Sequence, residues 1–238
     1  MKILVINPNS SETVTAAIME SARRAATSGT TLIGATTKGG TRNIDCAFGD
    51  YLSGAAMIRT CLEAVTLHTP DAVILAGFGR VGIDALKEAL TVPVVSISEA
   101  SMAVACLLGH RFTTLTMLQQ FIPYQQDLVR LFGFEAKCAS VRAININVEE
   151  CVKDRTRTLA ELTEQILAAV REDRAEVVIL ACAGLCGYER ELSQRAGVPV
   201  LDPVAVGVKV AESLVGLELA HSKIRKFAPP PQPLDHYL

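Results

Sequence analysis

One cysteine lies where an apolar run gives way to a turn of small residues. Cys182 follows the apolar residues 177–181 and precedes Ala183 and Gly184. We expect this thiol just after a buried strand and just before a helix, where free backbone N–H groups and the helix dipole favour a thiolate. The pattern predicts that Cys182 is an acid or base, and that the amides of Ala183 and Gly184 hold an enolate-like anion. A structural buried cysteine is the alternative interpretation.

A second candidate is the NPNS sequence at residues 7–10. It reads as a helix start, in which Asn9 caps the helix and Glu12 returns the hydrogen bond. Asn7 and the free amides of the turn would then remain available for a carboxylate or carbonyl of a substrate.

The sequence indicates structural roles for the other reactive side chains. The seven cysteines are an odd number in a chain of 238 residues, which argues for reduced thiols rather than a disulfide framework. Cys186 reads as a packing residue, and Glu99 as a carboxylate that complements a helix dipole. The four histidines show no metal-binding spacing, so we predict no metal.

Short apolar runs alternate with longer helical patterns along the chain. Strands are predicted at residues 3–6, 31–35, 72–76, 92–97, 112–116, 139–143, 177–181 and 198–201. Helices are predicted at about residues 10–27, 50–67, 82–90, 99–109, 120–132, 148–171, 187–195 and 203–217. Strands that are apolar on both faces are typical of parallel sheets covered by helices, so the fold class is α/β.

The two halves of the chain repeat one design. The sequence VILAGFG at residues 73–79 is echoed by VILACAG at 178–184, and VPVV at 92–95 by VPVL at 198–201. We therefore expect two lobes, residues 1–97 plus about 203–238 with a C-terminal arm, and residues 98–202. Ligands of such sheets bind beyond the carboxyl ends of strands, so an active-site cleft is expected between the lobes. The candidates at strand ends are Asn9, Ser10, Gly77, Phe78, Gly79, Thr116, Met117, Cys182, Ala183 and Gly184.

Composition limits the classes of partner. A net charge of -2, with scattered Lys and Arg, makes nucleic acid an unfavourable partner. The start of the chain does not read as a signal peptide and no apolar run is long enough to span a membrane, so we expect a cytoplasmic protein. The proline-rich residues 229–233 should form an extended arm, packed on the body or on a neighbouring subunit of a homo-oligomer.

Five motifs together resemble the hydantoin and allantoin racemases of the aspartate/glutamate and hydantoin racemase superfamily. They are INPNSS at residues 6–11, GTRNID at 40–45, VPVVSISEASMAVA at 92–105, RFTTLTMLQ at 111–119 and VILACAGL at 178–185. Their order and spacing cover nearly the whole chain.

The resemblance implies a cofactor-independent enzyme with two pseudosymmetric α/β lobes, acting on a small molecule of the hydantoin or ureide class. In this family two cysteines flank the acidic carbon, one removing the proton and the other returning it to the opposite face. The second family cysteine corresponds to Cys182. Positions that line the family's substrate pocket correspond to Asn9, Ser10, Ile44, Thr116 and the amides of Ala183 and Gly184.

The chain departs from the family at the first cysteine, which is replaced by Gly77, and at the acidic residue that follows, which is Arg80. Glycine in the first position with cysteine in the second is similar to arylmalonate decarboxylase, in which a lone thiol protonates one face of an enediolate. That enzyme's Thr and Ser after the glycine are Phe78 and Gly79 here.

Three functions remain open. The first is a hydantoin-type isomerase with an unusual second base, for which Cys46, Cys186 and Glu99 are candidates. The second is a lyase or hydrolase that uses Cys182 alone as an acid or nucleophile. The third is a non-catalytic protein that binds hydantoins or ureides.

Overall fold

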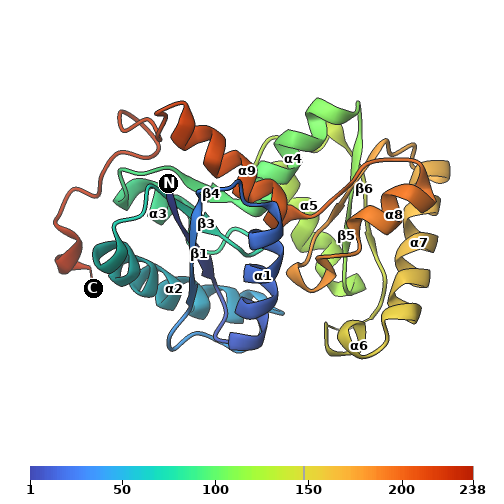
Figure 1. Cartoon of the computed structure of the whole chain (residues 1–238), viewed down its shortest axis with the longest axis horizontal. Coiled ribbons are helices and arrows are strands. Elements are labelled where there is room, and N and C mark those ends of the chain that lie inside the picture. Colours follow the sequence, from blue (N-terminus) through green and yellow to red (C-terminus); the bar gives the residue numbers. More distant parts are fainter. Residues whose placement is uncertain (147, 238) are drawn as a thin grey trace. The chain divides into compact units, whose positions relative to one another are not determined.

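The chain folds into two compact units, each built on a parallel four-stranded sheet (Figure 1). A computed structural model describes residues 1–146 and 148–237. One unit comprises Met1–Ile97 and Gly207–Leu238, and the other comprises Ser98–Val206. The α/β fold class with two lobes is confirmed.

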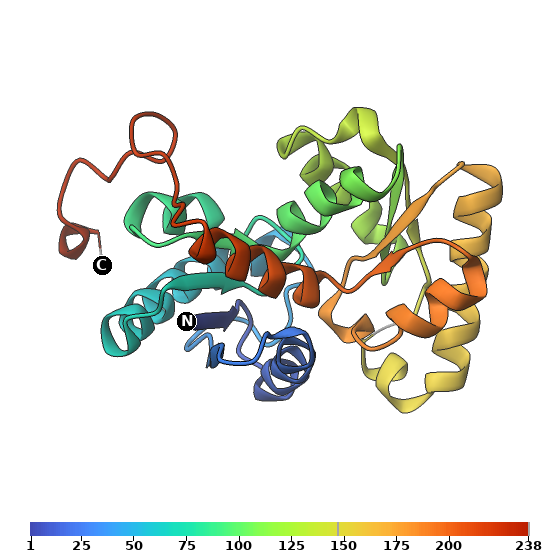
Figure 2. The same ribbon diagram turned by 45° about the horizontal axis from the view of Figure 1, so that its top comes forward.

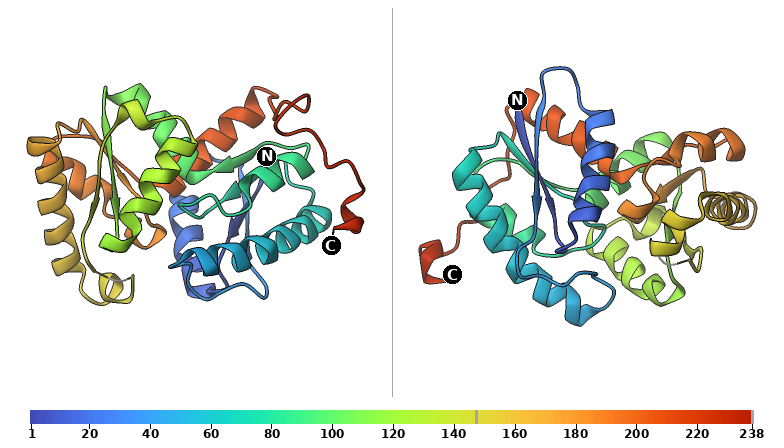
Figure 3. Two further views of the ribbon diagram at one scale, coloured as in Figure 1. Left: turned by 180° about the vertical axis from the view of Figure 1, so that it is seen from behind. Right: turned by 60° about the horizontal axis from the view of Figure 1, so that its bottom comes forward.

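In the first unit the strand order is β2-β1-β3-β4. The strands are β1 (Lys2–Asn7), β2 (Thr31–Thr36), β3 (Ala72–Leu75) and β4 (Val94–Ser96). The helices are α1 (Glu12–Ala25), α2 (Ala47–His68), α3 (Ile83–Ala89), most of α9 (Pro203–Gly216) and the 3₁₀ turn η4 (Leu234–His236). Helices α1 and α2 flank β1 on opposite sides (Figure 3, right).

The second unit has the strand order β6-β5-β7-β8. Its strands are β5 (Phe112–Thr116), β6 (Cys138–Ala143), β7 (Val177–Leu180) and β8 (Val200–Leu201). Its helices are α4 (Ile97–Leu108), α5 (Ile122–Leu131), α6 (Val148–Lys153), α7 (Arg155–Glu172) and α8 (Glu189–Ala196), with 3₁₀ turns η1 (Gln119–Phe121), η2 (Glu135–Lys137) and η3 (Ala183–Leu185).

The internal repeat predicted from the sequence is present in the topology, since both sheets place their second strand first and their fourth strand last. Equivalent residues also make equivalent hydrogen bonds. The amide of Val73 donates to the carbonyl of Pro93 at 2.9 Å, and that of Val178 donates to Pro199 at the same distance. The two VPV sequences therefore pair with the two VILA sequences in the same way.

The inner strands of each sheet are buried on both faces, whereas the edge strands β2 and β6 are largely half-buried. In the first unit, one face of β1, β3 and β4 packs on Met57 and Cys61 of α2 and on Leu86 of α3. In the second unit, β5, β7 and β8 pack on Leu162 of α7 and Leu192 of α8. Such double burial explains why the strands read as continuous apolar runs, and each predicted strand is present with its ends shifted by no more than two residues.

The prediction of one helix over residues 148–171 is wrong, because the chain forms α6 and α7 there. Asp154 separates them, and its carboxylate accepts a hydrogen bond from the amide of Arg157 at 2.9 Å. This side-chain cap begins a new helix where the apolar spacing alone continues the old one.

The C-terminal segment, which continues past the end of α9 in Figure 2, packs on its own unit. The Nε2 atom of His221 accepts from the amide of Val94 at 2.8 Å, which covers the edge of strand β4. Lys223 donates to the carbonyl of Glu88 at 3.1 Å, and Lys226 forms an ion pair with Asp84 at 3.2 Å. Residues 221–226, which precede the predicted proline-rich arm, are thus held against α3 and β4.

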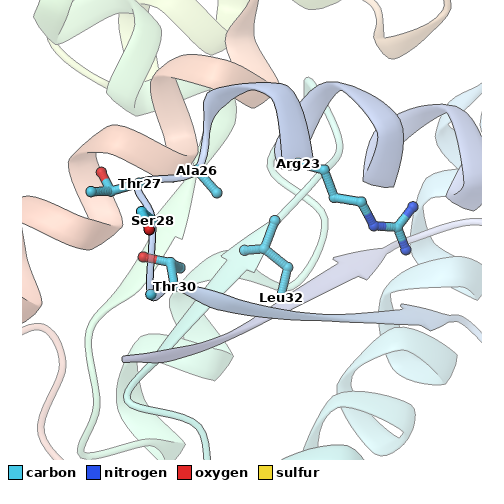
Figure 4. A pocket seen from close by; sticks show the side chains of 7 residues that line it. Arg23, Ala26, Thr27, Ser28, Thr30 and Leu32 are labelled. Atoms are coloured by element: carbon cyan, nitrogen blue, oxygen red, sulfur yellow. The ribbon is translucent and has the colours of Figure 1, made fainter.

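A shallow pocket lies where α1 leads into β2, lined by residues that include Thr27, Ser28 and Thr30 (Figure 4). Beside it, Glu212 of α9 accepts from the amide of Thr27 at 2.7 Å and from the hydroxyl of Thr30 at 2.7 Å. This loop precedes β2 and so lies at the opposite end of the strand from the candidate site residues. None of the described helices is both long and apolar enough to cross a membrane.

Candidate active site

Gly77 and Cys182 occupy equivalent positions in the two units. The amide of Ala76 donates to the carbonyl of Ile6, and that of Ala181 donates to Leu115, both at 2.9 Å. Gly77 therefore follows β3 beside the end of β1, and Cys182 follows β7 beside the end of β5. The carboxyl ends of adjacent parallel strands gather the candidates of each unit at one sheet edge.

Cys182 is half-buried and begins the 3₁₀ turn η3. Its Sγ atom accepts a hydrogen bond from the amide of Gly184 at 3.4 Å. Burial raises the pKa of the Cys182 thiol to about 11, and the hydrogen bond from Gly184 only partly opposes this shift. The thiol is therefore protonated near neutral pH.

The expected thiolate-favouring environment at Cys182 is accordingly wrong for the substrate-free chain. A turn of three residues follows the thiol, and α8 begins only at Glu189. The helix dipole that the sequence suggested is thus not at Cys182, and loss of solvent dominates. Ala183 is the first residue of η3, so its N–H has no acceptor within that turn.

Of the other thiols in this unit, Cys151 and Cys186 interact electrostatically with Cys182. Cys151 is buried, and its carbonyl accepts from the hydroxyls of Thr158 and Tyr188, each at 3.3 Å. The proximity of Cys151 contributes to the raised pKa of Cys182. No feature of the sequence had singled out Cys151, since a cysteine in an amphipathic helix reads as an apolar core residue.

The Cys186 thiol donates to Oδ1 of Asp202 at 3.3 Å. The same oxygen accepts from the amide of Val204 at 2.8 Å, at the start of α9. Burial, and then the charge of Asp202, raise the pKa of Cys186 well above its ordinary value. Cys186 is therefore a weak candidate for a second base, in line with a packing role. Across residues 1–146 and 148–237, no three His, Cys, Asp or Glu side chains are grouped as metal ligands.

Thr116 and Met117 complete the part of the site in the second unit. Both are buried at the end of β5, and the carbonyl of Thr116 accepts from the amide of Ile144 at 3.1 Å. Glu99 lies in the first turn of α4, where it is half-buried.

In the first unit, the side chain of Asn7 is hydrogen-bonded within its own loop and to α1. It is buried, and its Nδ2 atom donates to Oδ1 of Asn9 at 2.8 Å and to the hydroxyl of Thr15 at 3.0 Å. Its Oδ1 atom accepts from the amide of Asn9 at 3.2 Å. The expectation that Asn7 stays available to a substrate is wrong, because Asn7 holds the turn together.

The helix cap also differs from the expectation. Ser11, rather than Asn9, is the N-cap of α1, and it accepts from the amide of Val14 at 3.4 Å. Oδ1 of Asn9 accepts instead from the amide of Ser11 at 2.9 Å. Glu12 does not return to the cap, because its carboxylate accepts from the hydroxyl of Thr36 at 2.8 Å.

The loop before α2 packs on the NPNS turn. The amide of Ser10 donates to the carbonyl of Thr41 at 3.0 Å, and Ile44 is half-buried against the core of the first unit. Cys46 is exposed and is the N-cap residue of α2. The structure thus brings Asn9, Ser10 and Ile44 to one loop cluster.

Gly77 is tightly packed. A Cβ atom built at this position would lie 2.6 Å from Cγ of Pro8. Phe78 is half-buried and Gly79 is buried. Pro8 is a site residue that sequence reasoning missed, because nothing in the NPNS pattern tells that its ring packs against a turn almost seventy residues later.

Comparison with known proteins identifies the family. Residues 3–211 match the model of the Asp/Glu/Hydantoin racemase family. The hydantoin racemase of Paenarthrobacter aurescens is 35% identical over 97% of this chain and 98% of its own length. The crystal structure of allantoin racemase from Pseudomonas fluorescens is 39% identical with a TM-score of 0.94, and 98% of each chain is covered.

A more distant likeness concerns the fold alone. Unliganded arylmalonate decarboxylase is 18% identical with a TM-score of 0.65, over 90% of this chain and 92% of that one. The family is shown by the family model, which matches residues 3–211, and by the similarity to two racemases over nearly the full length. The chain is an enzyme of the racemase superfamily and belongs to the Asp/Glu/Hydantoin racemase family.

Proposed function

We propose that the chain is a cofactor-independent isomerase that transfers a proton at the acidic carbon of a hydantoin, of allantoin or of a related ureide. The observation that carries this proposal is the similarity to hydantoin and allantoin racemases over nearly the full length. We assign the proton transfer to Cys182, since it is a half-buried thiol at a strand end beside a turn with an open amide.

The protonated state of Cys182 bears on its role. A thiol whose pKa is about 11 is a ready proton donor to a carbanion, because it gives up its proton as charge develops on a substrate carbon. To remove a proton it must first become a thiolate, and a bound substrate that displaces water and adds N–H donors changes that balance. The amides of Ala183 and Gly184 are our candidates for stabilising the enolate oxygen.

The remaining candidates bind substrate in this proposal. Those in the first unit present a loop cluster with half-buried apolar and polar groups, and those in the second unit lie at the end of β5. They are Asn9, Ser10, Ile44, Phe78, Gly79, Thr116 and Met117.

An isomerase also needs a second acid or base, which serves the opposite face of the acidic carbon. Gly77 supplies no side chain, and Cys186 already donates its proton to Asp202. A racemase with Cys182 alone must use Cys46, Glu99 or water for the opposite face. General acid-base catalysis contributes roughly 10² to 10⁴-fold, so a missing partner slows inversion more than removal of the proton.

A second candidate function is a single-thiol lyase or hydrolase, in which Cys182 protonates one face of an enediolate or attacks a ring carbonyl. Glycine at position 77 favours it, because a lyase or hydrolase of this kind needs no second thiol opposite Cys182. In either case we propose a homo-oligomer that acts on a small molecule.

A comparison of substrates tests the proposal. The full chain is incubated separately with single enantiomers of 5-substituted hydantoins, with those of allantoin and with an arylmalonate, and both optical rotation and product mass are followed. Loss of rotation without a change of mass is expected from the isomerase. Loss of carbon dioxide from the arylmalonate, with no racemisation of the hydantoins, would show a lyase instead. Addition of water to a hydantoin, with no racemisation, would show a hydrolase instead.

A further inference from the structure

Helix α2 presents an apolar face to solvent. Phe48 is 75% exposed, Tyr51 is 73% exposed and Leu52 is 51% exposed, and Ala55 beside them is also exposed. These four residues form what we call the α2 stripe. Helix α2 runs along the first unit in blue to cyan (Figure 3, left).

The stripe is continuous because its residues follow helical spacing. Positions i, i+3, i+4 and i+7 share one face of an α-helix, and residues 48, 51, 52 and 55 have that spacing. The opposite face of α2 is already buried, since Met57 and Cys61 contact the sheet. The helix is therefore apolar on the side that should be polar if α2 simply met water.

The size of the stripe suits the centre of an interface rather than a whole one. Two aromatic side chains exposed by about three quarters and a half-exposed leucine present on the order of 350 Å² of apolar surface. A stable interface needs about 800 Å² from each partner, so the stripe must be surrounded by a polar rim.

Charged residues continue the stripe at both ends with opposite signs. Asp45 precedes α2, and Arg59 lies one turn beyond Ala55. Both are exposed, and in the described part of the chain neither forms an ion pair. Farther out the order of the charges is reversed, since exposed Arg42 before the stripe is positive and exposed Glu63 after it is negative.

We infer that the α2 stripe is the contact surface for a second copy of this chain, packed with the two α2 helices antiparallel about a two-fold axis near Leu52. A two-fold axis places each residue opposite the one at the same distance on the other side. Leu52 then meets Leu52 of the second copy, and the large ring of Phe48 lies opposite the small side chain of Ala56, next to Ala55 of the stripe.

The same register pairs the charges. Asp45 of each copy lies opposite Arg59 of the other, and Arg42 lies one residue from the point opposite Glu63. A parallel packing would instead set like charges against each other. The sequence of α2 is thus complementary to itself in size and in charge only when the helices run in opposite directions.

Sedimentation of the full chain at micromolar concentration tests the contact. The parent is expected at a multiple of the chain mass, and Phe48→Glu is expected to weaken association at least roughly 30-fold, since it places a charge at the apolar centre. Leu107→Glu is the matched control, because Leu107 is 84% exposed on α4 and lies outside the stripe. A parent that sediments as a monomer, or a Phe48→Glu chain that associates like the parent, would overturn the inference.

Charge reversal tests the register without touching the apolar centre. Asp45→Arg and Arg59→Asp should each weaken self-association by about tenfold, because each homodimer then holds two like-charged pairs. Mixing the two variants should restore association, since both pairs are opposite again in the heterodimer. If the mixture associates no better than either variant alone, the antiparallel packing is excluded. A stripe that binds lipid vesicles while the chain remains monomeric would also contradict it.

Discussion

A Cβ atom at Gly77 would lie 2.6 Å from Cγ of Pro8, closer than two carbon atoms pack in a folded protein. The position that corresponds to the first family cysteine is therefore closed by the ring of Pro8. Restoring the family's residue therefore needs room as well as a thiol.

Gly77→Cys alone should lower the free energy of unfolding by about 1 to 3 kcal/mol, because the new side chain is forced against a rigid ring. Pro8→Ala removes Cγ and Cδ, whose distances to the added Cβ are 2.6 and 3.3 Å. The double variant should recover stability relative to Gly77→Cys and should racemise 5-substituted hydantoins faster than the parent. Denaturant unfolding and polarimetry measure the two effects.

Pro8→Ala by itself is the control for loss of the ring. If Gly77→Cys is as stable as the parent, the crowding is relieved by a small shift and is unimportant. If the folded double variant binds a hydantoin yet gains no racemisation, the pocket is not of the two-thiol type.

Cys182→Ser should reduce turnover by at least roughly 10²-fold, since a hydroxyl is a far poorer acid and base than a thiol at this position. Cys106→Ser, at a half-buried position of α4, is the matched control and should keep parental activity. Turnover of the same substrate by both purified variants measures the difference. Near-parental activity of folded Cys182→Ser would remove this thiol from the mechanism.

The rate at which iodoacetamide alkylates Cys182 should rise about tenfold for each pH unit between about pH 7 and about pH 9. Only the thiolate reacts, and burial holds the pKa of this thiol at about 11, so its thiolate fraction keeps growing across that range. Peptide mass spectrometry follows Cys182, with exposed Cys46 as the reference for access of the reagent. A rate that levels off below about pH 8 would show that a thiolate is already stabilised in the free enzyme.

Glu212 should make stability depend on acid pH. Burial opposes its ionisation, but hydrogen bonds from Lys209, from the Thr27 amide and from the hydroxyls of Thr30 and Thr27 outweigh this and lower its pKa to about 2. Because this folded value lies below the unfolded value, the stabilisation is complete above about pH 4.5 and is lost as the pH falls toward about 2. Its size is on the order of 2 kcal/mol.

Glu212→Gln should therefore flatten the fall in unfolding free energy across that acid range, and Glu164→Gln, at an exposed position of α7, should leave it unchanged. Urea unfolding at a series of pH values measures both. Parallel acid profiles for Glu212→Gln and the parent would contradict the role of these hydrogen bonds.

Local patterns in the sequence predicted the sheets well, because strands buried on both faces, such as residues 73–75 and 178–180, are apolar without interruption. The matched VILA and VPV sequences also predicted the repeated pairing. The break at Asp154 was missed, since one capping side chain outweighed an apolar spacing that continues through α7.

The environment of the site residues depends on contacts between distant segments, which no local pattern contains. Asn7 looked available, yet Thr15 and Asn9 use its side chain. Cys182 looked activated, yet the helix starts only at Glu189 and burial raises its pKa. The ring of Pro8, which follows β1, packs against Gly77, which follows the neighbouring strand β3.

The central claim is that Cys182 transfers a proton at the acidic carbon of a hydantoin-type ring. The most direct test incubates each enantiomer of a 5-substituted hydantoin in deuterium oxide with the parent chain and with Cys182→Ser, following deuterium uptake and optical rotation together. With Cys182 as the only proposed thiol and no side chain at Gly77, one enantiomer should take up deuterium faster than it loses rotation in the parent, and both changes should fall to the uncatalysed rate in Cys182→Ser. Absence of enzyme-dependent uptake for either enantiomer by the folded parent, or unchanged uptake in Cys182→Ser, would contradict the claim.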